Sequence, residues 1–206
     1  MTSCDEIFAL GPVIAVLTIA DAADAAPVAE ALARGGVRGM EVTLRTPAAL
    51  EAITAMNAIE DVMCGAGTLL RVEDADRAGE AGARFLVSPG LSDDLMRAAD
   101  DWGVPILPGV ATATEIMRAM ALGCSALKFF PAEAMGGAAS VAAFAGPFPG
   151  VRFCPTGGIT LENAPDYLSL KNVGCVGSSW LAPQDVIARR DWAEITRRAK
   201  AATALR

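Results

Sequence analysis

Histidine is absent from this sequence of 206 residues. That absence excludes Ser/His/Asp and Cys/His triads, metal sites with imidazole ligands, and imidazole acting as an acid or base. Any chemistry must therefore use carboxylates, amines, thiols, hydroxyls or backbone groups. With 53% hydrophobic and 20% charged residues, the chain is too apolar to be disordered, and its length fits one globular domain spanning residues 1–206.

Long runs of one residue kind are missing too. No basic run is longer than a pair and the net charge is −7, so we expect no nucleic-acid partner and no membrane partner. The sequence has no stretch of 18 apolar residues and no basic leader, which argues against a membrane span or a signal peptide. The five cysteines lack Cys-x-x-Cys spacing, as is typical of a reducing compartment. We expect a cytoplasmic protein that acts on small molecules.

Short apolar runs of strand length alternate with alanine-rich stretches of helical spacing. Near-continuous hydrophobicity in the short runs is typical of parallel strands covered on both faces. The predicted strands are residues 13–18, 39–44, 63–66, 85–87, 105–107, 126–130, 152–155 and 175–177, and the predicted helices are residues 24–34, 47–59, 72–81, 93–102, 114–122, 140–145, 163–170 and 192–202. Eight such units favour an α/β fold of the closed (β/α)8 class, a TIM barrel, with a short N-terminal helix before the first strand.

An open doubly wound sheet is the alternative fold, but it usually has a glycine-rich fingerprint after its first strand, and this chain has none there. A weak repeat also supports the barrel. Glycine follows a helical stretch shortly before four of the strands, at Gly36, Gly82, Gly123 and Gly174. Glycine adopts the left-handed conformation at little cost, so the pattern predicts turns from helix to strand at these positions.

Polar residues in two predicted strands indicate where chemistry takes place. In the second strand, a period of two places Glu41, Thr43 and Arg45 on one face. The sixth strand holds Lys128 among apolar residues, and Lys128 is one of only three lysines. Burial disfavours the ammonium form of an amine, and a neutral amine can attack a carbonyl to form a Schiff base. Lys128 is therefore a candidate nucleophile.

The other interpretation of Lys128 is a structural ion pair with Glu41, or an amine that reaches the rim of the barrel. Glu41 and Lys128 together favour chemistry, because a retro-aldol reaction needs an amine and a base, and without histidine a carboxylate is the natural base. Arg45 is suited to clamp a substrate carboxylate.

Glycine and hydroxyl residues are concentrated after the predicted strands, where barrel enzymes bind their ligands. The loops that follow the seventh and eighth strands contain Gly157 and Gly158, and Gly177, Ser178 and Ser179. Exposed backbone N–H groups after these two strands commonly bind phosphate. A plain turn is the alternative for either loop alone, but the two together favour a phosphate site.

With these motifs placed, the sequence resembles the 2-keto-3-deoxy-6-phosphogluconate (KDPG) and 4-hydroxy-2-oxoglutarate (KHG) aldolases nearly from end to end. The resemblance rests on the combination and order of residues 41–46, 65–68, 88–90, 127–133 and 154–159. It implies a class I lyase of carbohydrate metabolism, in the Entner-Doudoroff pathway, that needs no metal and no other cofactor and assembles as a homotrimer.

The resemblance also implies roles for individual residues. Lys128 is expected to form the Schiff base and Glu41 to act as the general acid and base. Arg45 and Thr68 would hold the substrate carboxylate, and Thr156 would set stereochemical preference. Further expected site residues are the walls Pro89 and Phe130 and the phosphate contacts Gly157, Gly158, Gly177, Ser178 and Ser179. Thr18 stands where some relatives carry an arginine that reaches the substrate.

The expected reaction is cleavage of 2-dehydro-3-deoxy-6-phosphogluconate to pyruvate and D-glyceraldehyde 3-phosphate, with 4-hydroxy-2-oxoglutarate as a further substrate. A 2-dehydro-3-deoxy-6-phosphogalactonate aldolase is one alternative. A sugar-phosphate isomerase or epimerase is another, although the first strand lacks the second acid or base that such an enzyme needs. A non-catalytic sugar-phosphate-binding protein is a third alternative, and the Glu41 and Lys128 pair argues against it.

Overall fold

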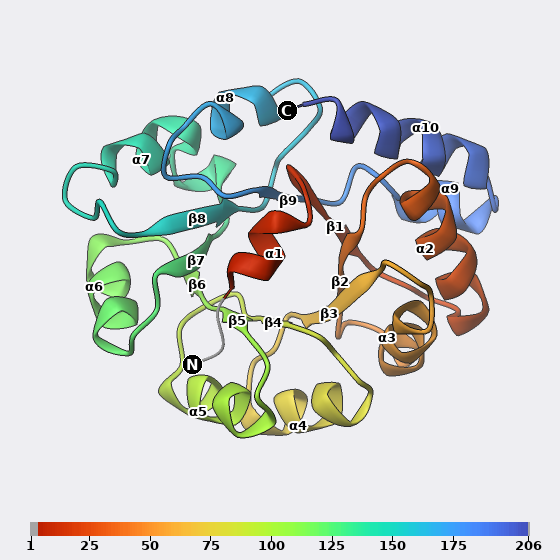
Figure 1. The fold of residues 1–206 in the computed structure, drawn as a ribbon, viewed down its shortest axis with the longest axis horizontal. Coiled ribbons are helices and arrows are strands. Elements are labelled where there is room, and N and C mark those ends of the chain that lie inside the picture. The colour runs from red at the N-terminus through yellow and green to blue at the C-terminus, as the bar shows by residue number, and fades with distance from the viewer. Residues whose placement is uncertain (1–3, 206) are drawn as a thin grey trace.

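The computed structural model describes residues 4–205. Strands and helices alternate along the chain, as the sequence predicts, and the helices surround the strands (Figure 1). The strands are β1 (Val13–Leu17), β2 (Gly39–Thr43), β3 (Met63–Gly67), β4 (Leu86–Val87), β5 (Ile106–Leu107), β6 (Gly109–Val110), β7 (Ala126–Phe129), β8 (Arg152–Pro155) and β9 (Val176–Ser178). Each predicted strand overlaps an observed one, and the predicted fifth strand is followed at once by a separate short strand, β6.

The α-helices are α1 (Asp5–Ala9), α2 (Ala25–Arg34), α3 (Ala49–Asn57), α4 (Val72–Glu80), α5 (Asp93–Trp102), α6 (Ala113–Ala121), α7 (Gly137–Ala143), α8 (Ala164–Leu168), α9 (Gln184–Ala188) and α10 (Trp192–Thr203). Two short 3-10 helices, η1 (Ala22–Asp24) and η2 (Glu133–Met135), complete the set. The predicted N-terminal helix is confirmed as α1. The sequence prediction missed α9 and η2, which are too short to show a helical period.

The strands pair in parallel, but they form two sheets rather than one continuous ladder of eight. One sheet has the order β5-β4-β3-β2-β1-β9 and the other the order β6-β7-β8. The prediction of an uninterrupted (β/α)8 ladder is corrected at two prolines. Pro108 separates β5 from β6; its carbonyl accepts from the Lys128 N–H at 2.9 Å, but it has no N–H to donate in return.

The second interruption lies after Pro155, which also lacks an N–H. There β8 and β9 are linked by isolated bridges, Phe153 with Val173 and Thr156 with Gly177. The fold is therefore α/β with a curled parallel sheet, interrupted where proline removes a ladder donor.

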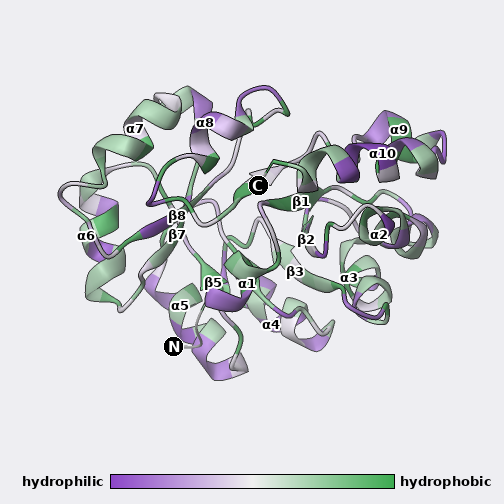
Figure 2. Ribbon diagram, turned by 45° about the horizontal axis from the view of Figure 1, so that its top comes forward, coloured by the Kyte–Doolittle hydropathy of each residue, from purple (hydrophilic) through white to green (hydrophobic). Residues whose placement is uncertain are grey.

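Local signals explain where the helices begin and end. Helix α5 begins after Ser92, whose side chain accepts from the Leu95 N–H, and ends at Gly103 in the left-handed conformation. Helix α6 has a capping box formed by Thr112 and Glu115. Both hydrophilic and hydrophobic stretches are visible on helices such as α5 and α10 (Figure 2), as expected for helices with one face on a core.

The predicted glycine turns are correct at three of the four positions. Gly36, Gly82 and Gly123 have positive φ angles of 89°, 79° and 83°. Gly174 is not among the glycines with positive φ, so the prediction of a left-handed turn there is wrong. At Gly174 an added Cβ would lie 2.6 Å from the Phe8 ring, so this glycine gives room to an aromatic side chain instead.

Two groups of buried apolar residues set the position of the site. The larger group fills the space between strands and helices. The smaller contains Ile7 and Phe8 of α1 with strand residues that include Phe85, Leu107 and Cys175. Figure 1 shows α1 crossing the middle of the ring of strands. Helix α1 and this apolar group fill one end of the ring, and the polar residues lie toward the other. No helix within residues 4–205 is long and apolar enough to span a bilayer.

Candidate active site

Strands β2 and β7 bring the two predicted catalytic residues together. Lys128 Nζ donates a hydrogen bond to Glu41 Oε1 at 3.3 Å, although the two residues are 87 positions apart in the chain. Their side chains are only 8% and 5% exposed. A buried ammonium or carboxylate is costly unless it is paired, so the pair accounts for how each charge is tolerated. It also places an amine and a carboxylate within proton-transfer distance.

The amine also faces an aromatic ring. Lys128 Nζ lies 5.2 Å from the centroid of the Phe130 ring, a cation–π distance. Phe130 follows β7 directly, so the same strand supplies the amine and one wall of the site. The Phe130 ring therefore covers one side of Nζ.

A cavity of about 440 Å³ opens beside this pair, at the carboxyl ends of the strands. It is lined by Val16, Thr18, Glu41, Arg45, Lys128, Phe130, Thr156, Gly157, Gly158, Ile159, Thr160, Gly177, Ser178, Ser179, Trp180 and Pro183. Among these lining residues Glu41 is the one carboxylate, while Lys128 and Arg45 are cationic. The cavity therefore suits an anionic small molecule. It also lacks the second acidic group expected of a sugar-phosphate isomerase or epimerase.

Thr156 contributes a hydroxyl to the cavity wall, between Lys128 and the segment that begins with Gly157 and Gly158, here called the glycine loop. Its side chain is buried, and its Oγ1 contacts the Cys154 carbonyl at 3.3 Å. A Cβ on Gly177 of the neighbouring strand would lie 2.3 Å from Thr156 Oγ1. Glycine at 177 is therefore what allows the threonine hydroxyl to occupy this position.

The predicted phosphate residues come together from two loops. Gly157 and Gly158 lie between β8 and α8 with positive φ angles of 101° and 80°. Ser178 ends β9 and Ser179 follows it, and all four residues line the cavity. The hydroxyl of Ser178 donates to the Ile159 carbonyl at 2.7 Å, so it holds the neighbouring loop.

Arg45 connects the main cavity with a neighbouring hollow. It follows β2, where its N–H bonds to the Thr43 carbonyl at 2.7 Å and turns the chain. Thr68, with a positive φ of 65°, lines the neighbouring hollow together with Arg45. Neither Thr68 nor Pro89 is among the residues that line the main cavity. The backbone of Pro89 lies against Gly109, where an added Cβ would meet the Pro89 carbonyl at 2.2 Å.

The structure adds lining residues to which the sequence prediction gave no role in the site, namely Val16, Ile159, Thr160, Trp180 and Pro183. Trp180 comes two residues after the end of β9, a position that the barrel rule marks as facing the ligand end. The indole Nε1 of Trp180 is buried without a hydrogen-bond partner within residues 4–205. Thr18, which stands where some relatives carry an arginine, also lines the cavity, and its hydroxyl lies 3.0 Å from Thr43 Oγ1.

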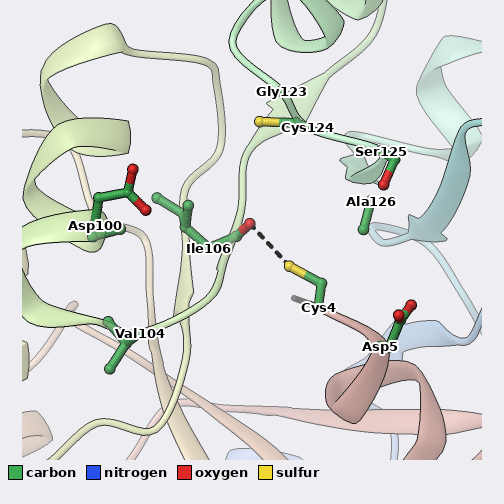
Figure 3. Close-up of a pocket in the computed structure, with 10 residues that line it drawn as sticks. Cys4, Asp5, Asp100, Val104, Ile106, Gly123, Cys124, Ser125 and Ala126 are labelled. Carbon is green, nitrogen blue, oxygen red and sulfur yellow. Dashed lines mark hydrogen bonds between the residues drawn. The ribbon is translucent and has the colours of Figure 1, made fainter. Parts of the chain in front are cut away.

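A second cavity of about 220 Å³ lies beside the start of α1 (Figure 3). It is lined by Cys4 and Asp5, by the end of α5 and the start of β5, and by residues 123–126, which lead into β7. Cys4 Sγ donates to the Ile106 carbonyl there at 3.3 Å, and Cys124 lines the same space. Burial raises the pKa of the Cys4 thiol to about 12 and that of Cys124 to about 11. Such thiols hold their protons at neutral pH, so this cavity has no ready nucleophile. Within the described residues no group of three or more Cys, Asp or Glu side chains is arranged to hold a metal ion.

Comparison with known proteins gives one consistent family. Residues 4–198 match the aldolase family described as KDPG and KHG aldolase. A protein named KHG/KDPG aldolase from Escherichia coli K12 is 46% identical over 202 residues, covering 98% of this chain and 95% of that protein.

Solved structures agree with the sequence relatives. The KDPG aldolase of Zymomonas mobilis, crystallised with 3-phosphoglycerate, superposes with a TM-score of 0.94 at 48% identity, covering 99% of this chain and 96% of that one. The KDPG aldolase of Legionella pneumophila, with pyruvate captured as a covalent carbinolamine intermediate, has a TM-score of 0.94 at 43% identity, and 98% of each chain is covered.

Proposed function

The chain belongs to the KDPG and KHG aldolase family, and on that premise we propose that Lys128 and Glu41 carry out its class I aldolase reaction. The reaction is the cleavage of 2-dehydro-3-deoxy-6-phosphogluconate to pyruvate and D-glyceraldehyde 3-phosphate. The observation that carries the residue assignment is the buried 3.3 Å contact between Lys128 Nζ and Glu41 Oε1 at the cavity wall.

The first half of the reaction forms the Schiff base. Lys128 passes a proton to Glu41 along their hydrogen bond, and the neutral Nζ attacks the C2 ketone of the substrate. Glu41 returns a proton to the resulting hydroxyl group, which leaves as water. The product is an iminium that draws electrons from the neighbouring carbon–carbon bond.

The second half breaks that bond. Glu41, directly or through a water molecule, accepts the proton of the C4 hydroxyl, and the electrons of the C3–C4 bond move into the iminium. The aldehyde leaves and an enamine remains on Lys128. Protonation of the enamine at C3 and attack of water on the restored iminium release pyruvate and regenerate the amine. Every proton moves between the substrate, water and the Lys128–Glu41 pair.

The ends of the substrate would be held by opposite walls of the cavity. Arg45 is the remaining cation of the cavity and would bind the carboxylate of the pyruvyl end, with Thr68 beside it in the neighbouring hollow. Phe130 would pack on the substrate near the amine, with Pro89 behind the wall. Gly157, Gly158, Gly177, Ser178 and Ser179 would receive the phosphate at the other end.

Thr156 would select the substrate by contact with the C4 hydroxyl. Its position between the Lys128–Glu41 pair and the glycine loop supports this role, and threonine favours the gluconate-type over the galactonate-type substrate by family resemblance. We also propose activity on 4-hydroxy-2-oxoglutarate, because the Escherichia coli relative bears that substrate in its name. That substrate lacks a phosphate and ends in a second carboxylate, so the phosphate contacts of the glycine loop would not form with it.

For the chain as a whole we propose a single-domain closed (β/α)8 barrel that assembles as a cytoplasmic homotrimer. The bridges between β8 and β9 and the Lys128 N–H bond to Pro108 support closure. The exposed side chains of Met117 and Met120, three residues apart on α6, support a partner surface. Light scattering on the purified protein tests the trimer.

Borohydride reduction in the presence of pyruvate tests the central assignment, because it converts an imine into a stable secondary amine. We expect a pyruvate adduct on the peptide that contains Lys128 and none in the Lys128→Ala variant. Lys171→Ala and Lys200→Ala are matched controls that should keep the adduct. An adduct on another lysine, or none on the folded wild-type protein, would contradict the Schiff-base role of Lys128.

A further inference from the structure

The backbone between β8 and α8 is held by an unbroken series of hydrogen bonds to its carbonyl groups. The carbonyl oxygens of Thr156 and Gly157 accept from the N–H groups of Ala132 and Glu133 at 2.8 and 3.1 Å. The Gly158 carbonyl accepts from Asn163 Nδ2 at 3.0 Å, and the Ile159 carbonyl accepts from Ser178 Oγ at 2.7 Å. Four consecutive carbonyls are thus bound on the protein side.

This arrangement determines where the N–H groups point. Across a planar trans peptide the C=O and the following N–H point in opposite directions. With the carbonyls of residues 156–158 held by the protein, the N–H groups of Gly158 and Ile159 are left without an acceptor within residues 4–205, whereas the parallel bridge of Thr156 with Gly177 directs the Gly157 N–H at the Gly177 carbonyl. All three residues line the active-site cavity. The two consecutive donors of Gly158 and Ile159, on residues that line one cavity, are suited to an anion.

Within residues 4–205, Asn163 is the one side chain that bonds to two neighbouring peptide units of this loop. Its Nδ2 donates to the Gly158 carbonyl, and its Oδ1 accepts from the Thr160 N–H at 2.8 Å. It precedes α8 and is not among the residues that line the cavity. Asn163 therefore acts on the loop from behind, where it does not touch a ligand.

A second contact from α8 supports the same loop, one helical turn further on. The hydroxyl of buried Tyr167 donates to the Glu133 carboxylate. The Glu133 side chain lies so close to Gly158 that an added Cβ there would be 2.6 Å from its Cγ. Tyr167 thus holds Glu133 under the loop while the Glu133 N–H binds the Gly157 carbonyl.

We propose that Asn163, assisted by the Tyr167–Glu133 pair, is the positioning residue that aims the N–H groups of Gly158 and Ile159 at the substrate phosphate. This inference rests on the proposed function of the loop and deepens it by assigning the side chains that set its geometry. Its specific consequence is that Asn163 governs discrimination between phosphorylated and unphosphorylated substrates. Schiff-base formation at Lys128 does not depend on Asn163.

The test compares 2-dehydro-3-deoxy-6-phosphogluconate with its unphosphorylated counterpart, 2-dehydro-3-deoxygluconate. In Asn163→Ala we expect KM for the phosphorylated substrate to rise about tenfold or more, because the donors lose their orientation. KM for the unphosphorylated substrate should change by less than about twofold. Tyr167→Phe removes only the hydroxyl and should shift the same ratio in the same direction.

Asn57→Ala is the matched control, because Asn57 also holds backbone with its amide. Its Nδ2 binds the carbonyls of Cys64 and Gly82, and its Oδ1 accepts from the Cys64 N–H, far from the loop. It should lower the melting temperature without changing the substrate ratio. Borohydride trapping with pyruvate, which has no phosphate, should be equal in the wild-type protein and the Asn163 and Tyr167 variants.

The outcomes separate the two proposals. A wild-type enzyme that prefers the phosphorylated substrate, with an unchanged preference in Asn163→Ala and Tyr167→Phe, would overturn the positioning role alone. A wild-type enzyme with no preference between the two substrates would contradict the phosphate-binding role of the glycine loop and this inference with it. A loss of kcat/KM by the same factor for both substrates in Asn163→Ala would show a general structural effect and would overturn the inference. A changed substrate ratio in Asn57→Ala would do the same.

Discussion

Gly67 of β3 lies so close to Glu41 of β2 that a Cβ at position 67 would sit 2.1 Å from Glu41 Oε1. The added Cβ would also lie 2.5 Å from Glu41 Cγ, so the end of the Glu41 side chain occupies the space that a larger residue at position 67 would need. Glycine at this position is thus part of the architecture that lets a buried carboxylate reach Lys128.

We expect Gly67→Ala to lower kcat by about a hundredfold, because the added methyl group displaces Glu41 and acid-base catalysis contributes about 10²–10⁴-fold. Steady-state kinetics measure the loss, and circular dichroism checks the fold. Gly146→Ala is the matched control, because a Cβ there meets nothing within 4 Å. Equal activity of the two variants would show that Glu41 does not depend on the space at Gly67.

Glu41→Gln keeps the size of the side chain but removes the proton acceptor. We expect kcat to fall by about 10²–10⁴-fold. The pyruvate adduct on Lys128 should still form under borohydride, because the amine is retained, but more slowly than in the wild-type enzyme, because Glu41 no longer exchanges protons with it. Kinetics and trapping on the same preparation measure the two effects separately. Turnover equal to that of the wild-type enzyme would remove Glu41 from its assigned role.

Thr156→Val replaces the cavity-facing hydroxyl with a methyl group of similar size. We expect the ratio of kcat/KM between the gluconate-type and galactonate-type substrates to fall by about tenfold, because a hydrogen bond to the C4 hydroxyl is lost. Thr18→Val is the matched control at another wall of the same cavity. If both variants change the ratio equally, the selectivity does not reside in Thr156.

The thiol of Cys64 makes folding sensitive to alkaline pH. Burial raises its pKa from 9.0 to about 12, so the folded state holds the proton more tightly than the unfolded state does. The resulting stability is fully present below pH 9 and is lost as the pH rises toward 12. At pH 10.5 the contribution of this thiol to the free energy of unfolding should be lower by about 2 kcal/mol.

Urea unfolding under reducing conditions at pH 8 and pH 10.5 measures this effect. Cys64→Ala should lose less stability between the two pH values than the wild-type protein does, because one titrating group is gone. Identical losses in the two proteins would show that Cys64 titrates alike in the folded and unfolded states.

Several features of the site follow from local sequence patterns. The period of two in β2 predicts that Glu41 and Arg45 share a face, and both line the cavity. A lone lysine in an apolar strand predicts that Lys128 is buried with a partner, and it pairs with Glu41. Glycine and hydroxyl residues that follow strands predict the loops at the ligand end. These patterns work because strand periodicity and turn chemistry are properties of a few neighbouring residues.

Other features depend on distances between segments, which sequence patterns do not give. The sequence assigns Thr68 and Pro89 to the site, yet they lie outside the main cavity wall, because cavity shape depends on how far each loop leans inward. Asn163 and Tyr167 show no local pattern that marks their hold on the glycine loop. Their partners Gly158 and Glu133 become neighbours only when α8 and η2 pack beside the end of β8.

The amino-acid sequence by itself determined the order of strands and helices, the absence of imidazole chemistry and the presence of a buried amine and carboxylate in two strands. Only the tertiary structure decided that Lys128 and Glu41, 87 residues apart, lie 3.3 Å from each other, and that Gly67 leaves space for the carboxylate. The reason is physical: periodicity fixes the face on which a side chain lies, whereas strand register and packing fix which faces meet and at what distance.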